Sequence, residues 1–146
     1  MTIKRMDHVG IIVDDLEAAV AFFGELGMER EGDGSVEGAW VDRVNAIDDV
    51  RVDIVMMRTP DGIGRVELTR FLSPALSDAE PTNAPPNTLG IRQIMFEVDD
   101  LEDTVARLRQ HGAQLIGEIA RYEDAYLICY VRGPAGIILA LAEAVG

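Results

Sequence analysis

The stretch HVGIIVDDLE, residues 8–17, recurs 85 positions later as QIMFEVDDLE, residues 93–102. A second match, 74 positions apart, aligns RTPDGI at residues 58–63 with RGPAGI at residues 132–137. Compositional bias would not hold such distant matches in register. The sequence therefore predicts two copies of one structural module, and this repeat decides the fold.

Each copy opens with a strand and a helix. Apolar residues alternate over 9–13, which is the period of a strand with one buried face. Asp14 is expected to cap the following helix, with Glu17 three residues on as in a capping box. Gly27 suits the left-handed residue that ends a helix. The second copy repeats this pattern, with Asp99 as the cap.

Three further strands are expected in each copy, over 37–41, 50–57 and 65–71 in the first and over 113–119, 125–132 and 137–143 in the second. The order βαβββ, twice, predicts an α+β fold. Its two mixed sheets are expected to form a cup-shaped pocket with the helices outside. The modules are expected over residues 1–72 and 91–146, joined by a proline-rich linker over 73–90, as one structural domain overall.

Composition excludes several classes of partner. The chain has 146 residues and a formal net charge of -13. Nucleic-acid binding needs clustered Lys and Arg, and anionic membranes repel an acidic surface, so neither partner is expected. No apolar run approaches the ~20 residues of a membrane span, and the N-terminus does not resemble a secretory signal. A cytoplasmic protein is therefore expected. Cys129, the only cysteine, is expected to be a buried thiol.

Strand parity indicates which side chains face the predicted cup. The apolar residues of strand 9–13 are expected to face the helix, which leaves His8 on the cup side. In the closing strand of the same copy, Glu67 is expected on that side. By the repeat, Gln93 corresponds to His8, and Ala140 corresponds to Glu67. These four positions are expected to converge on one pocket.

The second copy supplies further candidate pocket residues. Met95 and Glu97 share the parity of Gln93 and are expected to face the cup. Tyr126 and Tyr130 share a parity with each other. They either face the cup, where they would bind a substrate, or simply cover their strand. Both alternatives stay open from the sequence.

These features resemble the glyoxalase, bleomycin-resistance and extradiol-dioxygenase superfamily, also called the vicinal oxygen chelate superfamily. The likeness is carried by DHVGI at 7–11, VDDLE at 13–17, the RGPAG turn at 132–136 and the Glu-bearing closing strand. The resemblance implies a metal site with one ligand from the first and last strand of each module. His8, Glu67 and Gln93 are thus expected to hold one divalent metal, with Ni, Zn, Mn, Co and Fe as candidates. Ala140 departs from the pattern, because many members carry Glu there.

Three functions stay open. The first is a metal-assisted lyase or isomerase that acts on a small oxygenated substrate, with Glu67 as the catalytic proton carrier. The second is a metal-free protein of the bleomycin-resistance type that binds or sequesters a small molecule, which Ala140 favours. The third is a metal-free enzyme that uses Glu67 or Glu97 as a base. The resemblance also implies a homodimer.

Overall fold

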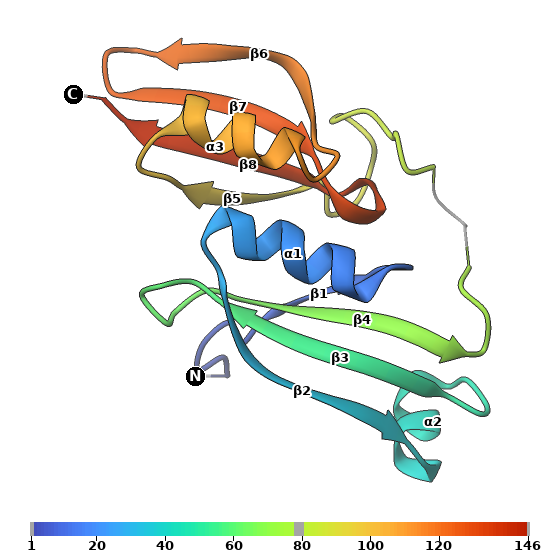
Figure 1. Cartoon of the computed structure of the whole chain (residues 1–146). Coiled ribbons are helices and arrows are strands. Elements are labelled where there is room, and N and C mark those ends of the chain that lie inside the picture. Colours follow the sequence, from blue (N-terminus) through green and yellow to red (C-terminus); the bar gives the residue numbers. More distant parts are fainter. Residues whose placement is uncertain (1, 78–80, 146) are drawn as a thin grey trace. The chain divides into compact units, whose positions relative to one another are not determined.

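The computed structural model of the chain describes residues 2–77 and 81–145. It divides into two compact units, Met1–Ser77 and Asp78–Gly146 (Figure 1). Each unit holds one four-stranded mixed sheet and a helix that follows its first strand. The predicted α+β class and the tandem βαβββ order are therefore confirmed. That the two sheets share one cup stays a prediction.

The elements of the first unit are β1 (Val9–Ile12), α1 (Leu16–Leu26), β2 (Glu29–Glu37), α2 (Ala39–Asn45), β3 (Arg51–Arg58) and β4 (Arg65–Ser73). Those of the second unit are β5 (Gln93–Glu97), α3 (Leu101–Arg109), β6 (Gln114–Tyr122), β7 (Tyr126–Arg132), the single 3-10 turn η1 (Pro134–Gly136) and β8 (Ile138–Ala144). Among the described residues, no helix is long and apolar enough to cross a membrane.

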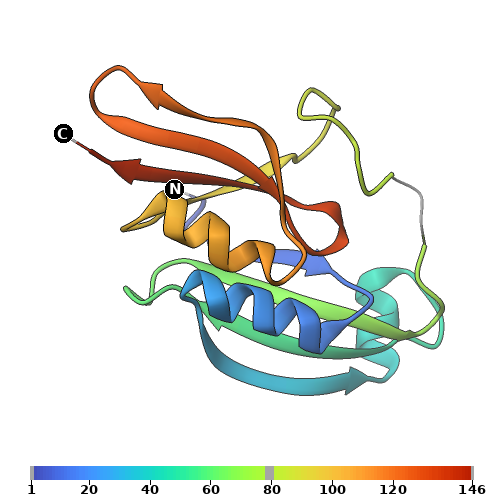
Figure 2. The ribbon, with the colours of Figure 1, turned by 45° about the horizontal axis from the view of Figure 1, so that its top comes forward.

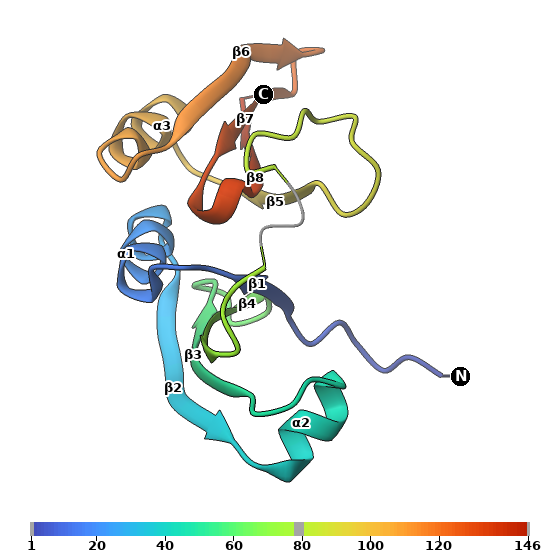
Figure 3. The ribbon, with the colours of Figure 1, turned by 90° about the vertical axis from the view of Figure 1, so that its right-hand side faces the viewer.

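The two sheets share one topology. Their strand orders are β1-β4-β3-β2 and β5-β8-β7-β6. In each sheet the first strand runs parallel to the last, and the other neighbouring pairs are antiparallel. The helix α1 lies against one face of the first sheet, and α3 lies against one face of the second (Figures 2 and 3). The face away from the unit's own helix α1 or α3 is called the open face below.

The repeat in the sequence is also a repeat in sheet register. β1 pairs with β4 so that Gly10 lies opposite Glu67, and β5 pairs with β8 so that Met95 lies opposite Ala140. Gly10 and Met95 are equivalent in the repeat. Glu67 and Ala140 therefore occupy equivalent positions on the open faces of their own units.

Both long helices begin one residue later than predicted. The caps predicted at Asp14 and Asp99 are wrong, because Asp15 and Asp100 hold these positions. The Asp15 carboxylate accepts a hydrogen bond of 3.0 Å from the backbone N–H three residues on. The N–H of Val13 still donates to the carbonyl oxygen of Thr69 in β4, so strand pairing continues past Ile12 and the cap falls one residue later, at Asp15. Because each cap is preceded by a second Asp, the pattern alone did not separate the two.

Burial follows the predicted parity in the first strand. Ile11 and Val13 are buried, whereas Ile12 between them is exposed. In α1, Phe22 and Phe23 are fully buried, with their rings edge to face and the centroids 5.5 Å apart. The helix then ends at a left-handed glycine, as predicted.

The strand predicted over 37–41 is wrong. β2 ends where that strand was expected to begin, and residues 39–45 form α2. Val41 of α2 is buried in a small cluster with Val50 and Val52. β2 itself is almost wholly exposed, so it carries no alternation of apolar residues. Its backbone pairing with β3 makes it a strand, and that pairing leaves no local sequence signal.

Part of the predicted linker is attached to the second unit. The Arg132 guanidinium, from β7, donates to the carbonyl oxygens of Ala84 at 2.9 Å and of Gly136 at 3.1 Å. Gly136 has a φ of +80°, and a Cβ there would overlap the backbone of Thr82. Ala84 is buried. The segment around Thr82 to Ala84 thus packs on the η1 turn instead of running free.

Candidate functional site

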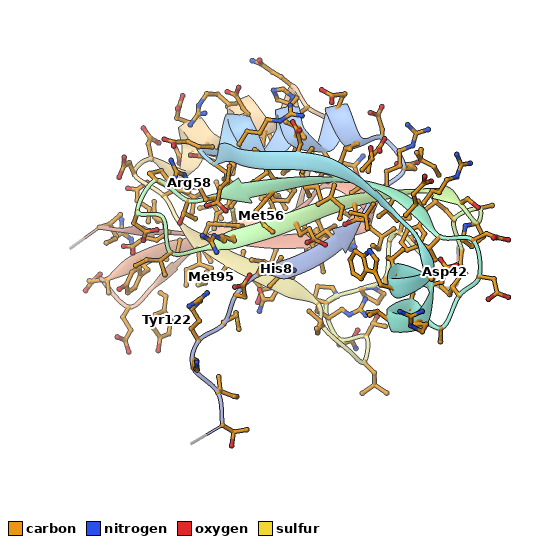
Figure 4. The ribbon with its side chains drawn as sticks, turned by 90° about the horizontal axis from the view of Figure 1, so that it is seen from below. His8, Asp42, Met56, Arg58, Met95 and Tyr122 are labelled. Atoms are coloured by element: carbon orange, nitrogen blue, oxygen red, sulfur yellow. The ribbon has the colours of Figure 1, made fainter. Side chains whose placement is uncertain are left out.

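The open face of the first sheet brings one imidazole and one carboxylate together. His8 lies directly before β1 (Figure 4), and Glu67 lies on β4, the strand that pairs with β1. His8 Nε2 is 3.5 Å from Glu67 Oε2, and the two side chains are 32% and 27% exposed. Both groups are therefore partly desolvated and still reachable from solvent. Two residues that the sequence predicted to share one site therefore lie side by side.

Each of these side chains has a second polar partner. Asp7 Oδ1 lies 2.8 Å from His8 Nδ1. The Thr69 hydroxyl, on a buried residue, donates to Glu67 Oε1 at 3.3 Å. The hydrogen bond with His8 is the main cause that holds the pKa of the Asp7 carboxyl below its ordinary value. These outer partners leave Nε2 and Oε2 as the atoms that face each other.

The spacing of this pair suits two ligands of one metal ion. A tetrahedral ion with bonds of about 2.0–2.1 Å holds neighbouring ligand atoms roughly 3.3–3.4 Å apart. The observed 3.5 Å is close to that value and long for a hydrogen bond. Imidazole and carboxylate are also ordinary ligands of divalent first-row metals. Within residues 2–77 and 81–145, no three His, Cys, Asp or Glu side chains gather as a metal cluster.

Mostly apolar side chains continue the first open face. On β3, Met56 lies opposite Glu67 and Ile54 lies opposite Thr69. Met56 and Arg58 both lie on β3 (Figure 4). Phe71, further along β4, packs against the small valine cluster beside α2. The imidazole and carboxylate pair thus has apolar neighbours across the sheet.

The open face of the second sheet carries the other predicted residues. Along β5, Gln93, Met95 and Glu97 are exposed, and the residues between them are partly buried. This alternation has the predicted parity. Met95 lies on β5 and Tyr122 lies on β6 (Figure 4). Gln93 belongs to the second unit, as does every other predicted substrate-binding residue.

A hollow of about 460 Å³ lies in the second unit where β6 bulges away from β7. Tyr130 lines this hollow, and Tyr126, the first residue of β7, is exposed. Tyr122 also lines it, pairs with Tyr126 across the strands, and was missed from the sequence. Tyr122 was missed because the strand predicted over 113–119 stopped short of it, whereas β6 runs on to Tyr122. The register shift between Ile116 and Ala120 adds two residues and leaves the strand parity unchanged. Hollows of this size accept small organic molecules.

Two residues of the second unit, Ala140 and Cys129, present no accessible reactive group to a site. Ala140 is 0% exposed and lies in register between Met95 and Tyr130, so larger side chains flank it. Cys129 is buried, and burial raises the pKa of its thiol to about 11. The predicted buried thiol is therefore confirmed.

Comparison with known proteins gives one family. A protein-family model, described as the glyoxalase/bleomycin resistance protein/dioxygenase superfamily, matches residues 7–130. The chain is similar to the crystal structure of a glyoxalase family protein from Bacillus cereus, with a TM-score of 0.94 and 46% identity over 100% of this chain and 97% of that one. No curated protein sequence matches the chain.

More distant structures share the fold. A glyoxylase/bleomycin resistance protein/dioxygenase domain from a Frankia species has a TM-score of 0.64 at 18% identity, over 98% of this chain and 99% of that one. A fosfomycin resistance protein from Listeria monocytogenes, solved as a mutant with Mn(II) and 1S,2S-dihydroxypropylphosphonic acid, has a TM-score of 0.64 at 15% identity. That match covers 99% of this chain and 92% of the other.

Proposed function

The chain belongs to the glyoxalase/bleomycin resistance protein/dioxygenase superfamily, and on that premise we propose that it is a metal-assisted lyase or isomerase acting on a small oxygenated molecule. The observation that carries the proposal is the pair of His8 Nε2 and Glu67 Oε2, 3.5 Å apart on one open face. The proposed metal is a single divalent ion, with Ni, Zn, Mn, Co and Fe as candidates.

The protein ligands in this proposal are His8, Glu67 and Gln93. Gln93 is the residue of β5 that the repeat pairs with His8, and its amide oxygen is the weakest of the three donors. When bound, the ion would act as a Lewis acid toward oxygen atoms of the substrate. The buried hydroxyl of Thr69 holds Glu67 Oε1, which keeps the carboxylate oriented with Oε2 toward His8.

Glu67 is the proposed catalytic residue. A carboxylate that is about three-quarters shielded from water can take a proton from a carbon next to a carbonyl group and return it to a neighbouring atom. Such a transfer is the common step of many isomerases and lyases. In this proposal, Glu67 does the proton transfer and His8 contributes binding only.

The second open face is proposed to bind the body of the substrate. The exposed Met95 and the hollow lined by Tyr130 offer apolar surface, and Tyr126 adds a hydroxyl. Gln93 and Glu97 supply polar groups from β5. A small molecule with an apolar part and a few oxygens fits this set of side chains.

A metal-free binding protein is the second candidate. Ala140 favours it, because the position equivalent to Glu67 has no ligand atom and is completely covered. A small molecule would then be held by the same side chains without turnover. The third candidate is a metal-free enzyme that uses Glu67 or Glu97 as its base.

Thermal unfolding with added metals separates the candidates. The protein is stripped with a chelator and melted alone and with each of the five ions. An ion supplied at about 100 times its dissociation constant should stabilise the protein by about 2.7 kcal/mol. The His8→Ala variant should lose that stabilisation. If none of the five ions shifts the wild-type transition, the metal-assisted function is excluded and the metal-free candidates stand.

We also propose a homodimer, as is common in this superfamily. Sedimentation equilibrium across a wide range of protein concentration measures the mass directly. A monomer at every concentration would rule the dimer out.

A further inference from the structure

His8 has two carboxylates beside it, and they are not equivalent. Asp7 Oδ1 lies 2.8 Å from Nδ1, which is an ordinary hydrogen-bond distance. Glu67 Oε2 lies 3.5 Å from Nε2, which is at the outer limit for one. The two ring nitrogens therefore face acceptors of unequal strength.

A neutral imidazole carries one N–H, and the better acceptor decides which nitrogen holds it. The short contact therefore favours the tautomer with its hydrogen on Nδ1, from which it would donate to Asp7. The lone pair of Nε2 then points toward Glu67 and is free to bind a metal. With the hydrogen on Nε2 instead, the nitrogen that faces Glu67 would have no lone pair to donate.

We propose that Asp7 is a positioning residue that fixes the Nδ1–H tautomer of His8 and so makes Nε2 ready to bind a metal ion. The inference rests on the proposed metal function above. It assigns Asp7 no contact with substrate or metal, because its carboxylate acts through the imidazole.

The location of Asp7 makes the proposal testable without loss of the fold. Its side chain is 53% exposed, and its second contact is with the exposed Arg5 at 3.4 Å. Asp14 offers a matched control, because it is an exposed Asp just past the other end of β1. Each Asp→Ala change removes one negative charge from the same unit.

The readout is the tautomer of His8 in metal-free protein, from long-range nitrogen–proton correlation spectra at a pH where both imidazoles are neutral. The chain has only two histidines, so His111 in the second unit serves as an internal reference. We expect Nδ1–H in the wild type and in Asp14→Ala. In Asp7→Ala the nearest remaining acceptor is Glu67, so we expect Nε2–H. Asp7→Asn keeps an amide oxygen as acceptor and should preserve Nδ1–H in part.

Calorimetric titration with Zn²⁺ or Ni²⁺ gives the second readout. Loss of an outer-shell partner of a ligating histidine typically weakens metal binding by about 10–100-fold, and we expect that loss in Asp7→Ala. Asp14→Ala should bind as the wild type does.

The outcomes are separable. A wild-type His8 with its hydrogen on Nε2, or an Asp7→Ala variant with an unchanged tautomer, would overturn the proposal. A changed tautomer with unchanged metal affinity would also overturn it, because Asp7 would then not prepare the ligand. If the wild type binds no metal at all, the proposed function fails, while the tautomer spectra still decide whether Asp7 orients His8.

Discussion

Ala140 occupies in β8 the register position that Glu67 occupies in β4. The two backbones repeat each other, but one position carries a partly exposed carboxylate and the other a fully buried methyl group. The first unit therefore offers a carboxylate ligand at this position, and the second unit offers none. The proposed ligands reflect this, because two come from the first unit and only an amide comes from the second.

The first prediction concerns Glu67→Gln. The change keeps the size of the side chain and removes its charge, so it should weaken metal binding and abolish proton transfer. A site weakened 100-fold gains only about 0.4 kcal/mol at a metal concentration that stabilises the wild type by about 2.7 kcal/mol. Glu97→Gln is the control, because it removes the same charge from β5 outside the proposed ligand set. Equal metal stabilisation of both variants would contradict the role of Glu67.

The second prediction concerns Ala140→Glu, which would restore a carboxylate at the equivalent position. Ala140 has no exposed surface and is flanked by Met95 and Tyr130, so the larger side chain has no room. Overpacking alone costs about 1–3 kcal/mol, and the desolvated charge adds to it, so urea unfolding should show a clear loss of stability. Ala144→Glu, at the exposed end of β8, should be nearly neutral. A stable Ala140→Glu variant with tighter metal binding would show that the site does accept a fourth ligand.

The third prediction concerns two glycines with left-handed backbones. Gly136 has a φ of +80° and Gly62 a φ of +77°, but only at Gly136 would a Cβ meet another backbone segment. Gly62→Ala should cost about 1–2 kcal/mol from backbone strain. Gly136→Ala should cost more and should raise amide hydrogen exchange around Ala84, because the segment that Arg132 holds must move. Equal losses in the two variants would contradict the packing of that segment on η1.

The fourth prediction concerns the Cys129 thiol. With a pKa of about 11 and 3% exposure, it should react very slowly with a thiol reagent in the native protein. At pH 8 only roughly one thiol in a thousand would be ionised, and the rate should rise with pH toward that pKa. In urea the reaction should be fast and stoichiometric, since unfolding exposes the thiol. Rapid labelling of the native protein at pH 8 would contradict the burial.

The sequence predicted most of the fold because its strongest signals are local and repeated. Alternation marked the strand before α1, and the closing strands were predicted within two residues of their observed ends. The sequence-based prediction failed at β2, whose exposed residues show no alternation of apolar and polar side chains. It also failed at the helix caps, where two Asp residues stand next to each other. It also missed Tyr122, because the predicted strand ended at residue 119 and β6 continues to Tyr122.

The sequence by itself determined that two copies of one module exist and that position 67 carries an acid where position 140 carries a methyl group. Both follow from residue identity and chain periodicity, which need no coordinates. Only the tertiary structure decided that His8 Nε2 and Glu67 Oε2 lie 3.5 Å apart, with Asp7 on the far side of the imidazole. The distance between His8 and Glu67 depends on the parallel pairing of β1 with β4, which joins residues almost sixty positions apart and which no local pattern encodes.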